Sequence, residues 1–394
     1  MRKRARTAVA IMAAALGLMP LATAWAGDAW TTKQRIFSDE ATDLVVTAAM
    51  LNPDPNKVGT ITTDGPAVSA LALAIINYLN TAGNPTDAGP VIKTITASNL
   101  DISGWTQNNE MTDSNTAHSV TGPLYIWGSK DGPAGTTATM GVQSASFTNV
   151  NLDNNTLSAA PTGWTSGVFE AWGSAARLVD VPNFPYSNSS VSGNQLKVVG
   201  VNEKFYLSGY GGAFVYDAHW NPTGSADART AQATFDNITF SNNKVLVSNI
   251  TNGAPHTSWA MGAGLALNGW NSDSGGAGTG NTGLAVKLKN VTFSGNQIAA
   301  TPAAGQTDGR VSGYGAALVA TYATRLMVEN TTFSNNSITT PGQNAFGGAV
   351  YMDLANSWIG GGPNTNTMTE LGTDAASGLK YYGEFVKTKF TDNS

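Results

Sequence analysis

The chain has 394 residues, no cysteine and few charged residues. Without cysteine no disulfide framework can stabilise the fold, and a zinc site loses its commonest ligand. The three histidines, His118, His219 and His256, share no metal-ligand spacing. Charged residues make up 12% of the chain, about half the usual share. The sequence therefore predicts neither a metal site nor a cofactor.

The first 26 residues have the features of a secretory signal peptide. Basic residues precede an apolar stretch over 8–21, and Ala24-Trp25-Ala26 fits the small-x-small pattern, which predicts cleavage between Ala26 and Gly27. The alternative is a buried N-terminal helix. Removing these residues leaves 17 Lys plus Arg against 26 Asp plus Glu, a formal charge of −9. That acidity argues against nucleic acid and anionic membranes as partners. After the signal, no run of 18 apolar residues predicts a membrane-spanning helix.

Residues 27–90 differ in pattern from the rest and predict a small helical or mixed cap. One helix is expected from a cap at Ser38 to the stop at Asn52-Pro53. A second is expected after Pro66, ending before Gly83.

From about residue 91 to 394 the helical period disappears and a short motif recurs. The copies stand at 149–155 (NVNLDNN), 237–243 (NITFSNN), 290–296 (NVTFSGN), 330–336 (NTTFSNN) and 387–393 (KTKFTDN). Each copy, with an apolar residue two positions before it, follows the pattern apolar-x-x-apolar-x-apolar. The step of three interrupts the period of two in a strand. We expect a bend there, with Asn149, Asn237, Asn290 and Asn330 in left-handed backbone, which Asn tolerates.

A second motif alternates with the first: YGGAFVY at 210–216, MGAGLAL at 261–267, YGAALVA at 314–320 and FGGAVYM at 346–352, with a looser copy at 172–178. Only 14 residues separate Phe333 from Gly347, too few for a full turn of a β-coil. The two motifs therefore lie on different sides of one turn. Constant strands joined by inserts of varying length predict a solenoid.

Stacked turns place equal positions above one another, about 4.8 Å apart. We expect the aromatic position to form an internal stack of Phe240, Phe293, Phe333 and Phe390. We expect the last asparagine of each motif to form an amide ladder of Asn155, Asn243, Asn296, Asn336 and Asn393.

The alternation of NxTFSxN with GGAxxY resembles the passenger repeats of bacterial autotransporters, and in particular the repeats of polymorphic outer membrane proteins. The matching positions include Phe240 with Asn243, Phe293 with Asn296, and Gly347-Gly348-Ala349. The resemblance implies a right-handed parallel β-helix with long loops. It also implies export through an outer-membrane barrel to the surface of a Gram-negative cell, and mostly adhesive activity. The chain has no such barrel and ends inside the fifth copy, so we expect it to be a fragment with a barrel beyond its C-terminus. A separately anchored secreted protein is the alternative.

Parallel β-helices also occur as polysaccharide lyases and hydrolases, which need clustered carboxylates. Asp217, Asn268, Thr321 and Asp353 occupy equal places after the second motif. The two aspartates should lie three turns or about 14 Å apart, whereas paired glycosidase carboxylates lie about 5–9.5 Å apart. The sequence therefore predicts no catalytic residues, and we expect a protein that is not an enzyme.

Three loop tryptophans follow the second motif at similar distances: Trp220, Trp270 and Trp358. A row of exposed Trp could stack on sugars or enter a protein interface. The alternative is that these side chains cover the flank of the coil. The sequence thus predicts a surface-displayed adhesion or aggregation scaffold that binds a host-cell protein or glycan, or itself. A secreted carbohydrate-active enzyme is the second hypothesis.

Overall fold

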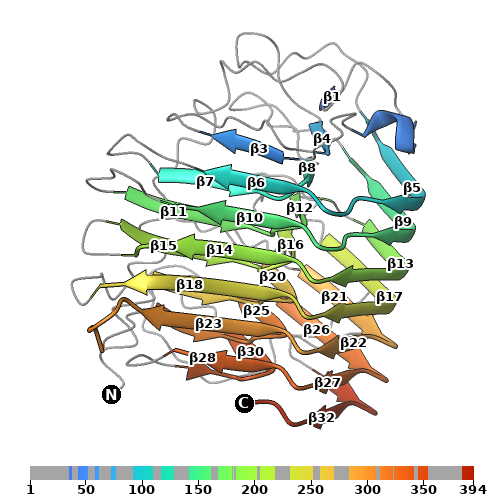
Figure 1. The fold of residues 1–394 in the computed structure, drawn as a ribbon. Helices are drawn as coiled ribbons and strands as arrows, with labels where there is room; N and C mark the ends of the chain where they lie inside the picture. The colour runs from blue at the N-terminus through green and yellow to red at the C-terminus, as the bar shows by residue number, and fades with distance from the viewer. Residues whose placement is uncertain are drawn as a thin grey trace, which may run out of the picture.

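A computed structural model shows a parallel β-helix in which successive coils stack along one axis (Figure 1). It describes residues 35–37, 43–51, 58–61, 72–76, 92–109, 117–127, 142–160, 167–179, 181, 183–201, 205–217, 231–251, 258–269, 284–307, 311–322, 324–340, 345–353 and 384–394. All strand pairs formed by these residues are parallel, because each strand pairs with its equivalents in the neighbouring coils.

Four sheets, A to D, run along the coil, and a complete coil visits them in the order B, C, D, A. Sheet A contains β1 (Arg35–Phe37), β4 (Leu73–Ile76), β8 (Leu124–Trp127), β12 (Ala176–Val179), β16 (Phe214–Asp217), β20 (Leu265–Gly269), β25 (Leu318–Tyr322) and β30 (Val350–Asp353). Sheet B contains β2 (Asp43–Val46), β5 (Thr94–Asp101), β9 (Ser144–Asn151), β13 (Asn183–Ser192), β17 (Ala231–Ser241), β21 (Leu284–Lys289), β22 (Thr292–Ser294), β26 (Thr324–Glu329), β27 (Thr332–Ser334), β31 (Glu384–Val386) and β32 (Lys389–Thr391).

Sheet C contains β3 (Val58–Ile61), β6 (Thr106–Asn109), β10 (Thr156–Ala159), β14 (Gln195–Val199), β18 (Lys244–Ile250), β23 (Gln297–Pro302) and β28 (Ser337–Thr339). Sheet D contains β7 (Ala117–Thr121), β11 (Gly167–Trp172), β15 (Phe205–Tyr210), β19 (Ser258–Met261), β24 (Val311–Tyr314) and β29 (Ala345–Phe346). The first motif of the sequence forms the end of sheet B and leads into sheet C, whereas the second joins sheet D to sheet A. The expectation that the two motifs are different sides of one turn is confirmed.

The prediction of two helices in residues 27–90 is wrong for the part of this region that the structure describes. Residues 43–46 form strand β2, in which Leu44 and Val46 are buried and their neighbours exposed, and β2 pairs with β5. Residues 73–76 form β4, which pairs with β8. The only helical segment described there is a single 3₁₀ turn, η1 (Ala48–Met50). The sequence of a short apolar stretch is compatible with a helix or a strand. Here the strand forms because its backbone hydrogen-bonds to strands of the neighbouring coil.

The bend inside the first motif is confirmed. Asn149, Asn237, Asn290 and Asn330 have φ of 54°, 56°, 54° and 47°, in the left-handed region. The structure adds two copies of the motif that the sequence comparison missed, at 99–105 and 188–194, with Asn99 and Asn188 in the same conformation. A second left-handed residue follows in each coil, directly before the ladder position, as at Asn154, Gly193 and Asn242. These two corners turn the chain from sheet B into sheet C.

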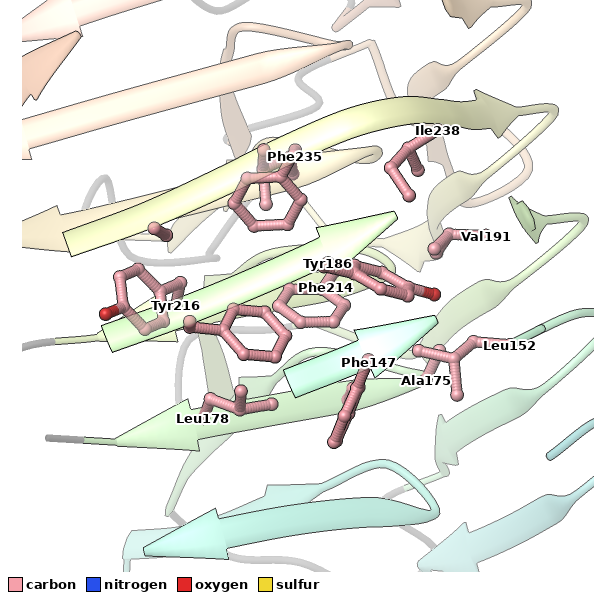
Figure 2. Close-up of a cluster of buried hydrophobic side chains, with 14 of the residues drawn as sticks. Phe147, Leu152, Ala175, Leu178, Tyr186, Val191, Phe214, Tyr216, Phe235 and Ile238 are labelled. Carbon is pink, nitrogen blue, oxygen red and sulfur yellow. The ribbon is translucent and has the colours of Figure 1, made fainter. Parts of the chain in front are cut away.

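The internal phenylalanine stack is also confirmed. Phe240, Phe293, Phe333 and Phe390 are in register, and their ring centroids lie 4.9, 4.8 and 4.8 Å apart with nearly parallel planes. The first three are fully buried, whereas Phe390 in the last coil is 51% exposed. From β9 to β17 the interior also contains a cluster of aromatic side chains that pack at steeper angles, among them Phe147, Tyr186 and Phe235, shown in Figure 2. Each such side chain contributes roughly 1.5–3 kcal/mol through burial.

The amide ladder extends beyond the expected residues. Asn155, Asn243, Asn296 and Asn336 are fully buried, and Asn393 ends the column. The side-chain amide of each residue donates to the side-chain oxygen in the next coil, over 2.8–3.1 Å, in the order Asn155, Asn194, Asn243, Asn296, Asn336, Asn393. Each side-chain amide also donates to a backbone carbonyl; for example, Asn296 Nδ2 donates to the carbonyl oxygen of Phe240. The sequence analysis missed Asn194, whose motif carries Ser189 in place of the middle apolar residue.

Candidate functional site

The two sides of the coil present different outer faces. On sheets B and C, buried and more exposed residues alternate, as in β10 and β14. On sheets D and A, strands β12, β16 and β19 are buried at every position. A separate apolar cluster lies there, outside the interior: Trp172, Val215, Trp259, Met261, Ala266 and Val319. Strands buried on both faces lose the alternating pattern, so the sequence alone gave little indication of this cluster.

Three charged side chains are buried on this outer face of sheets D and A. Arg177 of β12 donates to Asp217 of β16 over 2.9 Å, and its guanidinium carbon lies 4.2 Å from the ring centroid of Trp172. Asp217 is fully buried and also accepts a hydrogen bond from Asn268 over 3.1 Å. The Asp217 carboxylate is therefore satisfied by a cation and an amide, as a buried charge requires.

Glu170 of β11 is the third member of this group. It is 4% exposed, and its Oε2 has no hydrogen-bond partner in the part of the chain that the structure describes. Burial raises the pKa of Glu170 to about 7, although the positive charge of Arg177 acts in the opposite direction. A carboxyl group with such a pKa can donate or accept a proton near neutral pH. Glu170 and Arg177 lie on consecutive strands of one coil, whereas stacking of the next coil brings Asp217 to Arg177, and the sequence analysis did not combine these residues.

The four residues at equal places after the second motif were expected to lie above one another, and the structure confirms this alignment. Asp217, Asn268, Thr321 and Asp353 pair successively along sheet A. Thr321 donates to Asn268 over 3.2 Å, and Asn268 donates to Asp217. The first three side chains thus form a buried hydrogen-bonded column. Asp217 and Asp353 are three coil steps apart in this row, so their carboxylates do not form a catalytic pair.

Several expected residues lie outside the described part of the chain. These are the cleavage site at Ala26 and Gly27, the three tryptophans Trp220, Trp270 and Trp358, and His219 and His256. Their predicted roles stay predictions. Among the described residues, no group of three or more His, Cys, Asp or Glu is arranged to hold a metal ion. No helix in that same part of the chain has the length and apolar character needed to cross a membrane.

The corner between sheets B and C carries a partly exposed column of polar side chains. Its members alternate with buried residues and are in register or hydrogen-bonded between coils: Asp101, Asn151, Ser190, Thr239, Thr292, Thr332 and Lys389. A second column lies two residues further along each strand: Ser103, Asp153, Ser192, Ser241, Ser294, Ser334 and Thr391. We call these two columns the polar strip. They repeat at the coil spacing of about 4.8 Å, and along the strand at about 6.7 Å.

Hydroxyl side chains occupy the middle of the polar strip. The hydroxyl groups of Thr239, Thr292, Ser294, Thr332 and Ser334 make no hydrogen bond within the described part of the chain, although the backbone of these strands is paired. By contrast, Ser190 donates to Asp153 over 2.6 Å near the first coils, and Ser241 donates to Ser192 over 2.9 Å. The strip therefore offers regularly spaced donors and acceptors to an external partner.

Comparisons with known proteins add no assignment. No family model matches the chain, and neither a curated protein nor a solved structure matches it. The resemblance to autotransporter repeats therefore rests on the motifs alone.

Proposed function

We propose that the protein is a non-catalytic binding scaffold, displayed on the surface of a Gram-negative cell as an autotransporter-type passenger, and active in adhesion or aggregation. The observation that carries the proposal is the regular stack of in-register coils with a partly exposed polar strip along one corner. The inward positions are used for packing and for the amide ladder. In the middle of the strip, the hydroxyl groups of Thr239, Thr292 and Thr332 make no hydrogen bond among the described residues, so they can serve recognition at little cost to stability.

The test is attachment by cells that display the protein and otherwise adhere poorly. We expect such cells to bind host-cell layers or immobilised glycans above the level of cells carrying an empty display system. The Trp270→Ala variant should attach less while its β-type circular dichroism is unchanged, because an indole side chain can stack on sugars or pack in a protein interface. Absence of both attachment and aggregation in correctly displayed protein would contradict the proposed function.

A carbohydrate-active enzyme is the second candidate, and the group of Glu170, Arg177 and Asp217 favours it. A carboxyl group with a pKa near 7 beside an arginine and a second carboxylate is an arrangement that acid–base chemistry uses. Asp217, however, is fully buried and Glu170 nearly so. The test is release of unsaturated or reducing sugar from acidic and neutral polysaccharides. Activity that disappears in Glu170→Gln would establish the enzyme and remove the scaffold proposal.

A further inference from the structure

Six asparagines lie above one another at the first left-handed corner of successive coils, where sheet B bends towards sheet C (Figure 1). We call them the outer asparagine column: Asn99, Asn149, Asn188, Asn237, Asn290 and Asn330. All six are exposed, with φ between 47° and 56°. In four consecutive coils a hydroxyl residue follows two positions later: Asn188 with Ser190, Asn237 with Thr239, Asn290 with Thr292, and Asn330 with Thr332. These four copies have the pattern Asn-x-Ser/Thr, in which x is not proline.

The pattern occurs only at exposed corners of this chain. The asparagines that begin it are Asn154, Asn188, Asn237, Asn249, Asn290, Asn330 and Asn335. Each of them is exposed and has a positive φ. No asparagine of the buried ladder begins the pattern, because the residue two positions later points inward, as Leu157 and Val245 do. Asn-x-Ser/Thr is the pattern at which enzymes attach sugars to asparagine on surface segments of exported proteins.

The fold does not require the hydroxyl group of this pattern. In three of the four coils the hydroxyl belongs to a threonine that makes no hydrogen bond through its side chain among the described residues: Thr239, Thr292 and Thr332. At the same place in earlier coils stand Asp101 and Asn151, so the position accepts other polar groups. The hydroxyl group is, however, what a sugar-transferring enzyme needs two residues after the acceptor asparagine.

The outer asparagines can carry a sugar and keep their contacts in the fold. A side-chain amide has two hydrogens, and these side chains donate at most one of them to the described residues. Asn237 Nδ2 donates to Asn188 Oδ1 over 2.9 Å, and Asn290 Nδ2 donates to Asp236 Oδ1 over 2.9 Å. A sugar replaces one hydrogen and leaves the other to donate. By contrast, Asn296 of the buried ladder uses both hydrogens.

We propose that the outer asparagine column is a modification site, and that Asn188, Asn237, Asn290 and Asn330 each carry one N-linked sugar. The donor is a sugar whose anomeric carbon is activated by a nucleoside diphosphate, and a separate transferase catalyses the step. Nδ2 bonds to the anomeric carbon, and the bond from that carbon to the diphosphate oxygen breaks. The nucleoside diphosphate leaves with the electron pair, and a proton passes from Nδ2 to a base of the transferase.

The coil spacing limits the size of the sugar. Neighbouring asparagines of the column are about 4.8 Å apart, and the rings of Phe293 and Phe333 stack at the same distance of 4.8 Å inside the coil. A pyranose ring is thicker than a phenyl ring, so each coil has room for one ring and not for a branched chain. A nucleotide donor, which delivers a single sugar, therefore fits the column better than a preassembled oligosaccharide.

The transfer precedes folding. In the folded coil stack the backbone N–H of Asn290 donates to the carbonyl of Glu329 over 3.1 Å, and Thr292 is paired with Thr239 on one side and Thr332 on the other. An active site cannot enclose an acceptor segment whose backbone is paired in this way. The sugar is therefore added to the unfolded chain, and the exposed corner accommodates it when the coils stack.

The first experiment maps sugars by mass spectrometry of peptides from the protein isolated from the cells that produce it. We expect one sugar on each of the four asparagines that begin the pattern. Asn99 and Asn149 are the controls within the same column, because they have the same corner and exposure but no hydroxyl residue two positions later. Unmodified asparagine at all four positions would overturn the inference. Branched oligosaccharides in adjacent coils would overturn the assignment of a nucleotide donor.

The second experiment changes the pattern and leaves the asparagine in place. Thr239→Val should remove the sugar from Asn237 alone, and Thr239→Ser should retain it, with the other three positions as controls in the same molecule. Asn151→Thr creates the pattern at Asn149 and should add a sugar there. Circular dichroism shows whether each variant folds, but the transfer precedes folding and does not depend on it. A sugar that stays on Asn237 in Thr239→Val, or none gained at Asn149, would overturn recognition of the pattern.

This inference does not depend on the proposed function, and their tests can fail separately. A protein without sugars that still mediates attachment would remove the modification site and leave the scaffold proposal standing. A protein with sugars at the four positions that mediates neither attachment nor aggregation would contradict the proposed function alone.

Discussion

The amide ladder gives the sharpest prediction for stability. Asn296→Ala removes four hydrogen bonds. The backbone N–H and one side-chain N–H of Asn243 lose their acceptor Asn296 Oδ1, at 3.2 and 2.9 Å, and the carbonyl of Phe240 loses its donor Asn296 Nδ2, at 3.0 Å. Asn336 Oδ1 loses the same amide as a donor, at 2.8 Å, but keeps the backbone N–H of residue 296. A buried polar group without a partner costs about 1–3 kcal/mol. A water molecule can occupy the space of the removed amide and reduce the sum, so we expect a loss of about 3 kcal/mol.

The measurement is urea unfolding, together with hydrogen exchange of the Asn243 amide. Because each coil contacts only its neighbours, faster exchange should be confined to the coils next to the substitution. Asn237→Gly is the matched control. It removes an exposed asparagine whose side chain donates to Asn188 over 2.9 Å, and glycine tolerates its φ of 56°. We expect a change below about 1 kcal/mol in this variant. Equal destabilisation by the two substitutions would refute the reasoning about buried amide groups.

Two further predictions concern the interior and the outer face. Phe293→Ala should cost about 3–5 kcal/mol in unfolding experiments, because its ring is fully buried between two others; Phe390→Ala, at a half-exposed ring, should cost less than half of that, and equal losses would contradict the stack. For Glu170, the folded pKa of about 7 lies above the ordinary value of 4.5, so the folded state binds the proton more tightly. Its contribution to stability is therefore complete below pH 4.5 and is lost as the pH rises through 7, by at most about 3 kcal/mol. Glu170→Gln should remove this dependence of the unfolding free energy on pH. A pH dependence that persists in the variant would show that another group causes it.

The sequence by itself determined the repeating part of the fold. The left-handed corners at Asn149 or Asn237, the stack of Phe240, Phe293 and Phe333, and most of the amide ladder follow from local conformational preference and from the requirement that equal residues lie above one another. Both constraints act on a few adjacent residues in each coil, so they leave a visible motif. The copies at 99–105 and 188–194 depart further from the motif, because Trp105 replaces the last asparagine in the first and Ser189 replaces the middle apolar residue in the second, although their corners are the same.

The tertiary structure alone decided what depends on neighbouring coils. Residues 43–46 and 73–76 carry apolar patterns that suit a helix or a strand, and hydrogen-bonding partners in β5 and β8 select the strand. The same stacking brings Asp217 to Arg177 on the outer face, and aligns Asp101, Thr239 and Lys389 in one polar strip. Loop inserts of variable length hide these relations in the sequence, because residues 40 to 57 positions apart become neighbours only when the coils are stacked.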